Sequence, residues 1–314
     1  MNVSPACGDG DAGSASGEVL TIERLHLSLK SERRSPARLL LRGIDLSLRA
    51  GEVHGLVGES GAGKSMVGRT VLGIAPPGAR VEEGSIRLLG QDWLALSEPR
   101  RREYLGRDVA LIPQDPLTAL NPAHRIARQI GDVLQLHLGL DGAAARQRAL
   151  ELLTAVQVRA PERVLHQYPH ELSGGMRQRV LIAIAFACKP KLIIADEPTT
   201  ALDVTVQREI LRLLRALQQT EGAAVLFITH NLGIVSKLCD RVSVIHSGHI
   251  VESGPVRDIC ERPRHAYTRA LFAATPRYDR PAEMLAPIDD QVTDALWADT
   301  RAYETRYLAG RPSQ

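Results

Sequence analysis

The sequence predicts an α/β fold with a mixed, largely parallel sheet. Short apolar segments with the character of strands alternate with segments of helical periodicity along much of the 314-residue chain. A glycine-rich turn follows one of these strands, and a pair of acidic residues ends another. Strands that alternate with helices are typical of parallel sheets, and polar groups at strand ends are typical of their ligand sites. The length is sufficient for one large domain or two modest ones.

The N-terminal part predicts a disordered tail followed by three strands. Residues 1–17 are rich in Gly, Ser, Ala and Asp and have neither a basic start nor an apolar run. We therefore expect a disordered tail and no signal peptide. Apolar patterning then predicts strands over residues 19–29, 39–48 and 53–57.

The middle of the chain predicts a helix, two strands and a helical insert. The helix is expected over residues 64–73, where Pro76, Pro77 and Gly78 stop it, and the strands over 85–89 and 109–112. Helical periodicity then extends from residue 116 to about residue 169.

The C-terminal half returns to alternating strands and helices and shows no internal repeat. Its apolar segments cover residues 180–187, 192–195, 206–217, 224–229 and 242–245. The composition shifts after Pro276 toward Pro, Asp and Glu, and residues 293–308 could form one further helix.

Composition excludes several classes of function. The net charge is +3, from 39 basic and 36 acidic residues, so nothing favours nucleic acid as a partner. The four cysteines form no CxxC or zinc pattern. The longest uncharged apolar run, Val180–Cys188, is too short to span a bilayer. We expect no transmembrane segment, and a location in the cytoplasm or on a membrane through a partner.

A phosphate-binding loop is expected between the strand 53–57 and the helix that begins at Lys64. The pattern is G-x-x-x-x-G-K-[ST], in which backbone N–H groups and a helix N-terminus converge on phosphate oxygens. Lys64 should reach the β- and γ-phosphates of ATP, and the Ser65 hydroxyl should ligate Mg²⁺. The loop consists of Gly58, Glu59, Ser60, Gly61, Ala62, Gly63, Lys64 and Ser65.

An acid pair ends the buried strand at residues 192–195 and completes the expected nucleotide site. Asp196 should hold Mg²⁺, and Glu197 should polarise the attacking water. An acid pair after a strand is by itself more often a helix cap. Its combination with the phosphate loop makes the catalytic interpretation the stronger one.

The segment that resembles a known family is Leu172-Ser173-Gly174-Gly175-Met176-Arg177-Gln178-Arg179. It looks like the signature of ATP-binding-cassette (ABC) ATPases. The order of further motifs fits the same family. Gln114 follows a strand as the Q-loop glutamine does, Asp203 stands in the D-loop position, and His230 ends a strand as the switch histidine does.

The residues in and around these motifs closely resemble those of the D-type ATPases of peptide/nickel importers. The segments that carry this resemblance are 113–122, 171–179, 198–207 and 263–271. The last segment has His-Ala-Tyr-Thr where the family usually has His-Pro-Tyr-Thr. The resemblance covers residues 18–276 and implies the P-loop NTPase core, an antiparallel β subdomain and a helical subdomain at about 116–178. It divides the chain into the tail at 1–17, an ATPase domain at 18–275 and an extension at 276–314.

The resemblance also implies function and partners. Two ATPase subunits would close on two ATP molecules, and Ser173, Gly174 and Gly175 would bind the γ-phosphate held by the opposite subunit. Gln114 would contribute to Mg²⁺ binding and catalysis, and His230 would contact the γ-phosphate. The partners would be an F-type ATPase subunit, two membrane permeases and an extracytoplasmic binding protein. The subunit would sit on the cytoplasmic face of the cell membrane and energise uptake of di- or oligopeptides.

Two departures from the family pattern are visible. The strand region 19–57 contains no Phe, Tyr or Trp to stack on adenine, which leaves Leu29, His26 or Arg38 as substitutes. No cysteine follows Pro276, whereas many long D-type members carry a cysteine-rich motif there. We therefore expect no iron–sulfur cluster.

Other functions stay open at this point. Nickel, metal chelates and glutathione are alternative solutes. A translation factor or a DNA-repair cassette is a non-transport alternative, although the former usually carries two cassettes and the latter a long coiled coil. A cassette that binds ATP without hydrolysing it is disfavoured by Glu197 and His230.

Overall fold

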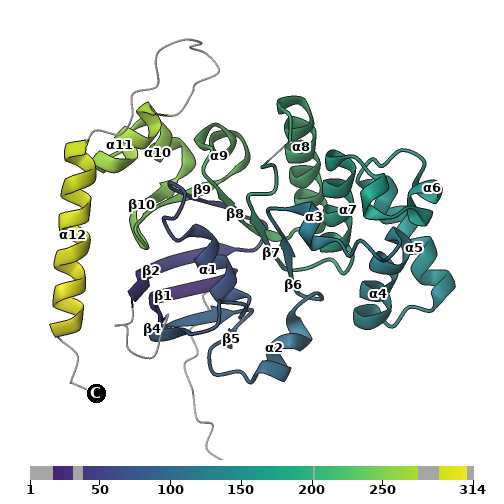
Figure 1. The fold of residues 1–314 in the computed structure, drawn as a ribbon, viewed down its shortest axis with the longest axis horizontal. Helices are drawn as coiled ribbons and strands as arrows, with labels where there is room; N and C mark the ends of the chain where they lie inside the picture. Colours follow the sequence, from purple (N-terminus) through teal and green to yellow (C-terminus); the bar gives the residue numbers. More distant parts are fainter. Residues whose placement is uncertain (1–16, 31–37, 201, 275–289, 310–314) are drawn as a thin grey trace, which may run out of the picture.

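The computed structural model describes residues 17–30, 38–200, 202–274 and 290–309. The predicted disordered tail, apart from Gly17, lies outside the described residues, as does the chain immediately after Pro276. The described chain contains two sheets and the helices that cover them (Figure 1).

The first sheet is antiparallel, has four strands in the order β2-β1-β4-β5, and confirms the predicted β subdomain. The strand β4 begins six residues before the predicted segment 85–89, because Glu82 and Glu83 interrupt its apolar pattern. The strands are β1 (Glu18–Leu29), β2 (Arg38–Arg49), β4 (Ala79–Leu88) and β5 (Gln91–Asp92).

The second sheet has six strands in the order β10-β9-β3-β8-β7-β6. Every neighbouring pair is parallel except β9 with β10, so the carboxyl ends of β3, β8, β7 and β6 lie along one edge. The strands are β3 (Val53–Val57), β6 (Val109–Ile112), β7 (Leu192–Asp196), β8 (Ala224–Thr229), β9 (Arg241–His246) and β10 (His249–Pro255). This confirms the mixed, largely parallel sheet.

Helices α3 to α8 lie on one side of the molecule and α12 lies on the opposite side, beside β2 and β10 (Figure 1). The segment 206–217 falls within α8, and the segment 180–187 falls within α7 except for Ala187, which caps that helix. The helices are α1 (Lys64–Val71), α2 (Glu98–Tyr104), α3 (Pro116–Ala119), α4 (Ile126–Leu138), α5 (Gly142–Ala155), α6 (Pro161–His166), α7 (Gly174–Phe186), α8 (Val204–Glu221), α9 (Leu232–Leu238), α10 (Val256–Glu261), α11 (Ala266–Ala273) and α12 (Asp290–Ala309).

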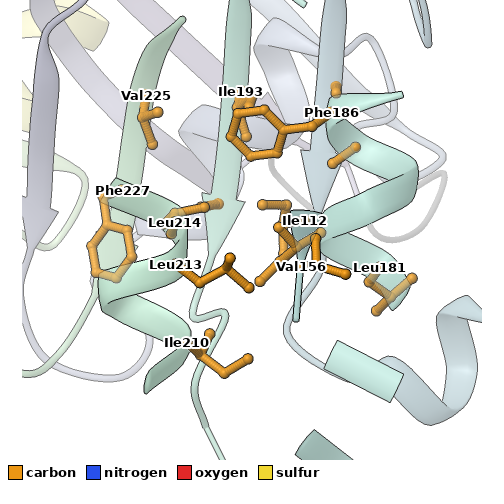
Figure 2. Close-up of a cluster of buried hydrophobic side chains, with 14 of the residues drawn as sticks. Ile112, Val156, Leu181, Phe186, Ile193, Ile210, Leu213, Leu214, Val225 and Phe227 are labelled. Carbon is orange, nitrogen blue, oxygen red and sulfur yellow. The ribbon is translucent and has the colours of Figure 1, made fainter. Parts of the chain in front are cut away.

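A largely aliphatic core fixes α7 and α8 against the parallel sheet (Figure 2). Burial of each large apolar side chain contributes about 1.5–3 kcal/mol, so this cluster dominates the packing energy of these layers. The strand ends are therefore held in a fixed arrangement. The labelled members are Ile112, Val156, Leu181, Phe186, Ile193, Ile210, Leu213, Leu214, Val225 and Phe227.

Among the described residues, no helix combines the length and the hydrophobicity needed to cross a membrane.

Candidate nucleotide site

The phosphate loop, residues 58–65, connects the end of β3 to the start of α1. A Cβ atom at Gly58 would lie 2.1 Å from the carbonyl oxygen of Ile245, so only glycine fits there. Gly63 has φ of 103°, a left-handed conformation that glycine adopts without strain, and it precedes the first residue of α1. The backbone of the loop is thus set by its glycines, as the sequence pattern predicts.

The Lys64 amine lies inside this loop. The side chain is 4% exposed, and Nζ donates to the carbonyl oxygens of Gly58 and Glu59 at 2.8 Å each. Burial lowers the pKa of Lys64, while the carboxylates of Glu197, Asp196 and Glu59 act in the opposite direction. The charged amine therefore faces the acid pair.

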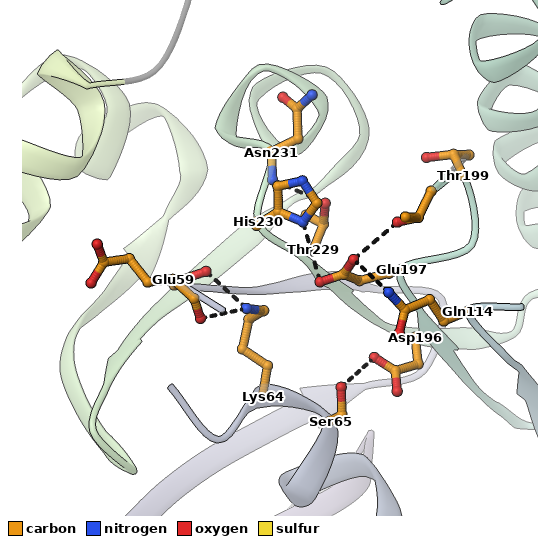
Figure 3. A network of polar contacts seen from close by, with 12 residues as sticks. Glu59, Lys64, Ser65, Gln114, Asp196, Glu197, Thr199, Thr229, His230 and Asn231 are labelled. Atoms are coloured by element: carbon orange, nitrogen blue, oxygen red, sulfur yellow. Dashed lines mark hydrogen bonds and ion pairs between the residues drawn. The ribbon is translucent and has the colours of Figure 1, made fainter. Parts of the chain in front are cut away.

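Ser65 and Asp196 converge at one point. The Ser65 hydroxyl donates to Asp196 Oδ1 at 2.8 Å (Figure 3). Burial raises the pKa of Asp196, and the hydrogen bond from Ser65 opposes this effect. No group of three or more His, Cys, Asp or Glu suitable for a metal occurs among the described residues. Mg²⁺ commonly takes only one or two protein oxygens beside phosphates and waters, so these two oxygens fit that ion.

Glu197 lies at the centre of a polar network (Figure 3). Its carboxylate accepts from Gln114 Nε2 at 3.2 Å and from the Thr200 hydroxyl at 2.9 Å, and it lies 3.2 Å from His230 Nδ1. Its φ is +46°, an uncommon value for a residue with a side chain. Uncommon backbone conformations of this kind are found most often at functional sites. In this conformation the Glu197 carboxylate contacts Gln114, which follows β6, and His230, which follows β8.

The structure thus brings together the predicted residues that lie at or after the ends of four parallel strands. Lys64 and Ser65 follow β3, Gln114 follows β6, Asp196 is the last residue of β7 and is followed by Glu197, and His230 follows β8. His230 has a side chain that is 54% exposed, so its imidazole can meet a ligand above the sheet edge.

The signature residues lie elsewhere. Ser173 caps the N-terminus of α7 by accepting from the Met176 N–H, and Gly174 and Gly175 form the first turn. Together with Val206 and Glu209 of α8, Ser173 and Gly175 line a groove of about 800 Å³ in which no residue of the phosphate loop takes part. Asp203 caps α8 through the N–H groups of Thr205 and Val206. These residues and the phosphate loop do not meet within one chain.

The candidates for adenine stacking have different environments. His26 is 4% exposed, stacks on Tyr307 at 4.4 Å between ring centroids, and shares a hydrogen bond of 2.6 Å with the Tyr303 hydroxyl. Tyr307 of α12 therefore covers one face of the His26 ring. Leu29 and Arg38 pair with each other across β1 and β2 and remain as candidates.

Two contacts of the site were not expected from the sequence. Thr200 donates to the Glu197 carboxylate, and the Tyr267 hydroxyl contacts Glu59 of the phosphate loop. The spacing of three residues between Glu197 and Thr200 was a local signal for the first contact. The second joins residues 208 positions apart, for which the sequence holds no local signal.

Comparison with known proteins places the chain in a family. Residues 41–200, which make up half of the chain, match the family described as ABC transporter, and residues 251–301 match the oligopeptide/dipeptide transporter C-terminal region. The chain belongs to the ABC transporter ATPases. It binds and hydrolyses ATP as a member of that family, which confirms the predicted family, fold and enzymatic activity.

Curated relatives of this ABC ATPase are named for the transport of dipeptides or of peptidoglycan. It is 46% identical to the probable D,D-dipeptide transport ATP-binding protein DdpD of Escherichia coli, over 93% of this chain and 89% of that one. It is 43% identical to the dipeptide transport ATP-binding protein DppD of the same organism, over 86% and 82%. It is 54% identical to the peptidoglycan transport ATP-binding protein YejF of Agrobacterium fabrum, over 76% of this chain but only 44% of that longer relative.

Solved structures share the ABC ATPase fold. The dimeric post-hydrolysis cassette MJ0796 bound to ADP and Pi aligns with a TM-score of 0.67 at 24% identity, over 76% of this chain and 99% of that one. The cassette cbiO1 from Clostridium perfringens, part of the ABC transporter complex cbiONQ, aligns with a TM-score of 0.65 at 26% identity, over 79% and 92%.

Proposed function

We propose that this ABC ATPase hydrolyses ATP to power the import of di- or oligopeptides, with the residues at the strand ends as its catalytic centre. The observation that carries the catalytic part is the convergence of Lys64, Ser65, Asp196 and Glu197 with Gln114 and His230 at one edge of the parallel sheet. Convergence of a phosphate loop with a carboxylate base is what phosphoryl transfer to water requires.

The proposed reaction begins with ATP on the phosphate loop. Backbone N–H groups of residues 58–65 and the N-terminus of α1 bind the phosphates, and Lys64 leaves its loop carbonyls to contact the β- and γ-phosphates. Ser65, Asp196 and Gln114 would hold Mg²⁺, which when bound neutralises charge on the β- and γ-phosphates.

Glu197 then acts as the general base. It takes a proton from water while the water oxygen attacks the γ-phosphorus, and the bond to the β–γ bridging oxygen breaks to release ADP and phosphate. The bonds from Gln114 and Thr200 hold the carboxylate in place, and His230 contacts the γ-phosphate and orients the water. A positioned base of this kind contributes about 10²–10⁴-fold to the rate.

A second ATPase subunit would complete the site. Ser173, Gly174 and Gly175 present the N-terminus of α7 beside an open groove, which suits a γ-phosphate held by another subunit. We propose an F-type subunit as this partner, so that the active unit is a heterodimer.

Two membrane permeases would dock on the helical side, and an extracytoplasmic binding protein would deliver the solute to them. An apolar groove of about 240 Å³ lies there, lined by Leu72, Leu105, Val133 and Ile184 among others. Ile74, which also lines this groove, is 52% exposed, so apolar surface is accessible to a docking partner there. The subunit would thereby sit on the cytoplasmic face of the membrane. In this proposal residues 18–275 are the ATPase domain, 116–178 its helical subdomain, 1–17 a tail and 276–314 an extension.

The solute is proposed from the relatives and is tested by uptake. The names of DdpD, YejF and DppD refer to D,D-dipeptides, peptidoglycan and dipeptides, respectively. Uptake of labelled L,L-dipeptide, D,D-dipeptide and nickel should be compared in source cells that carry either the wild-type gene or Glu197→Gln. Loss of uptake of either peptide supports the proposal. Loss of nickel uptake alone would show that the transported solute is a metal and not a peptide. Unchanged uptake of all three compounds would overturn the solute assignment.

A further inference from the structure

The C-terminal region of the chain contacts the phosphate loop directly. The hydroxyl of Tyr267, in α11, accepts a hydrogen bond from the Glu59 N–H at 3.3 Å. The same hydroxyl donates to Glu59 Oε2, also at 3.3 Å. One phenol therefore restrains both the backbone and the side chain of the second residue of the loop.

Tyr267 is itself held rigidly. It is 1% exposed, and its ring packs edge-on against His246 with 4.7 Å between ring centroids. Its N–H donates to His265 Nδ1 at 3.2 Å, which caps α11. The loop before α11 is tied to β10, because the Glu252 carboxylate accepts from the N–H groups of Arg264 and His265. The Tyr267 side chain that contacts Glu59 is therefore held in one position by its surroundings.

The restrained residue is also a partner of the catalytic lysine. The carbonyl oxygen of Glu59 accepts from Lys64 Nζ at 2.8 Å, so Tyr267, Glu59 and Lys64 form a continuous series of contacts. Burial raises the pKa of Tyr267 above its ordinary value, so the hydroxyl keeps its proton and can donate to the Glu59 carboxylate at physiological pH.

We propose that Tyr267 is a positioning residue for ATP: it fixes Glu59 and thereby the conformation of the phosphate loop that receives the β- and γ-phosphates. The C-terminal region, residues 251–301 by family match, then contributes to nucleotide affinity in the same chain. This inference rests on the proposed role of Lys64 and its loop. A tyrosine that only fills space would affect folding without changing the affinity of the folded protein.

The test is Tyr267→Phe in the full-length chain, which keeps the ring on His246 and removes the hydroxyl. Loss of these hydrogen bonds should weaken ATP binding by about 3- to 10-fold. In the assembled ATPase, the KM for ATP should rise by a similar factor with kcat nearly unchanged, because the lost interaction is present in both ground and transition states. A smaller active fraction would instead lower kcat at constant KM.

Three further variants separate the possible causes. Glu59→Ala alone and combined with Tyr267→Phe should show non-additive losses, since both remove the same carboxylate contact. Tyr104→Phe, which removes a phenol hydroxyl from α2, should leave ATP affinity unchanged. Lys64→Ala tests the underlying site: if it binds ATP normally, the proposed function of the loop fails. If Lys64→Ala abolishes binding while Tyr267→Phe binds as wild type, only the inference about Tyr267 is overturned.

Discussion

The phosphate-loop edge and the signature helix belong to the same chain, but only the polar residues of the first gather at one point within it. At the sheet edge, side chains from four strand ends contact one another at hydrogen-bonding distance. At the start of α7, Ser173 and Gly175 border a groove formed with α8, and no phosphate-loop residue lines that groove. In line with the proposed function, we infer from this difference that one chain can hold the nucleotide and that hydrolysis needs a surface contributed by another subunit.

The cause of this difference lies in topology. Parallel strands deliver their carboxyl ends to one edge regardless of how far apart they are in the sequence, so β3, β6, β7 and β8 assemble a site automatically. Helix α7 is held instead by the core on the helical side, where Phe186 lies beside Ile193 and Leu181 lies near Val156 (Figure 2).

The largest expected effect comes from Glu197→Gln. The amide keeps the shape of the side chain but cannot accept the proton of the attacking water, so kcat should fall by about 10²–10⁴-fold. ATP binding should be retained, because Lys64 and the loop are unchanged. Steady-state phosphate release and equilibrium ATP binding measure the two quantities.

The control for this variant is Glu261→Gln, which alters an exposed carboxylate on α10 that pairs with Arg257. It should hydrolyse ATP at close to the wild-type rate. Turnover by Glu197→Gln near that of wild type would show that Glu197 is not the general base. The edge of the parallel sheet would then have no assigned catalytic carboxylate.

A smaller and more selective effect is expected from Ser173→Ala. The chain alone should bind ATP as wild type, because Ser173 does not contact its own phosphate loop. With the partner subunit present, the ATPase rate should fall by roughly 10-fold, which is the value of one hydrogen bond to a charged phosphate. Equal losses in the single chain and in the assembly would contradict the division between the two regions.

Much of the nucleotide edge could be predicted from the sequence because its determinants are local. The phosphate loop needs glycines at Gly58 and Gly63 for steric reasons, and the acid pair directly follows an apolar strand. The alternation of strands and helices along the sequence was likewise sufficient to predict the largely parallel sheet. Each of these patterns is contained within about ten neighbouring residues.

Other features could not be predicted because they join distant segments. The contact of Tyr267 with Glu59 and the stacking of His26 on Tyr307 depend on where α11 and α12 pack. The helices α9 and α10 were not predicted from the pattern of apolar residues. They are short, so their formation depends on tertiary packing more than on a local sequence pattern. The expectation of no iron–sulfur cluster concerns the chain after Pro276 and stays a prediction.

The smallest expected effect is a dependence of stability on pH at the side of the molecule covered by α12. Burial lowers the pKa of His249 to about 4, and nearby Arg42, His26 and His246 act in the same direction. The ordinary value is about 6.5, so between these two values the unfolded chain binds a proton that the folded chain does not. Stability should therefore decrease as the pH falls through this window and should level off below it.

This effect should be confined to the region where His249 packs edge-on against Tyr303 of α12. Amide hydrogen exchange, corrected for the intrinsic rate at each pH, should show weaker protection of α12 and β10 at pH 5 than at pH 7, with α7 unaffected. His249→Phe keeps an aromatic ring but cannot be protonated, so its Tm should change less over the same range. Parallel losses of Tm in both proteins, or equal loss of protection in α7, would show that another group responds to the acid.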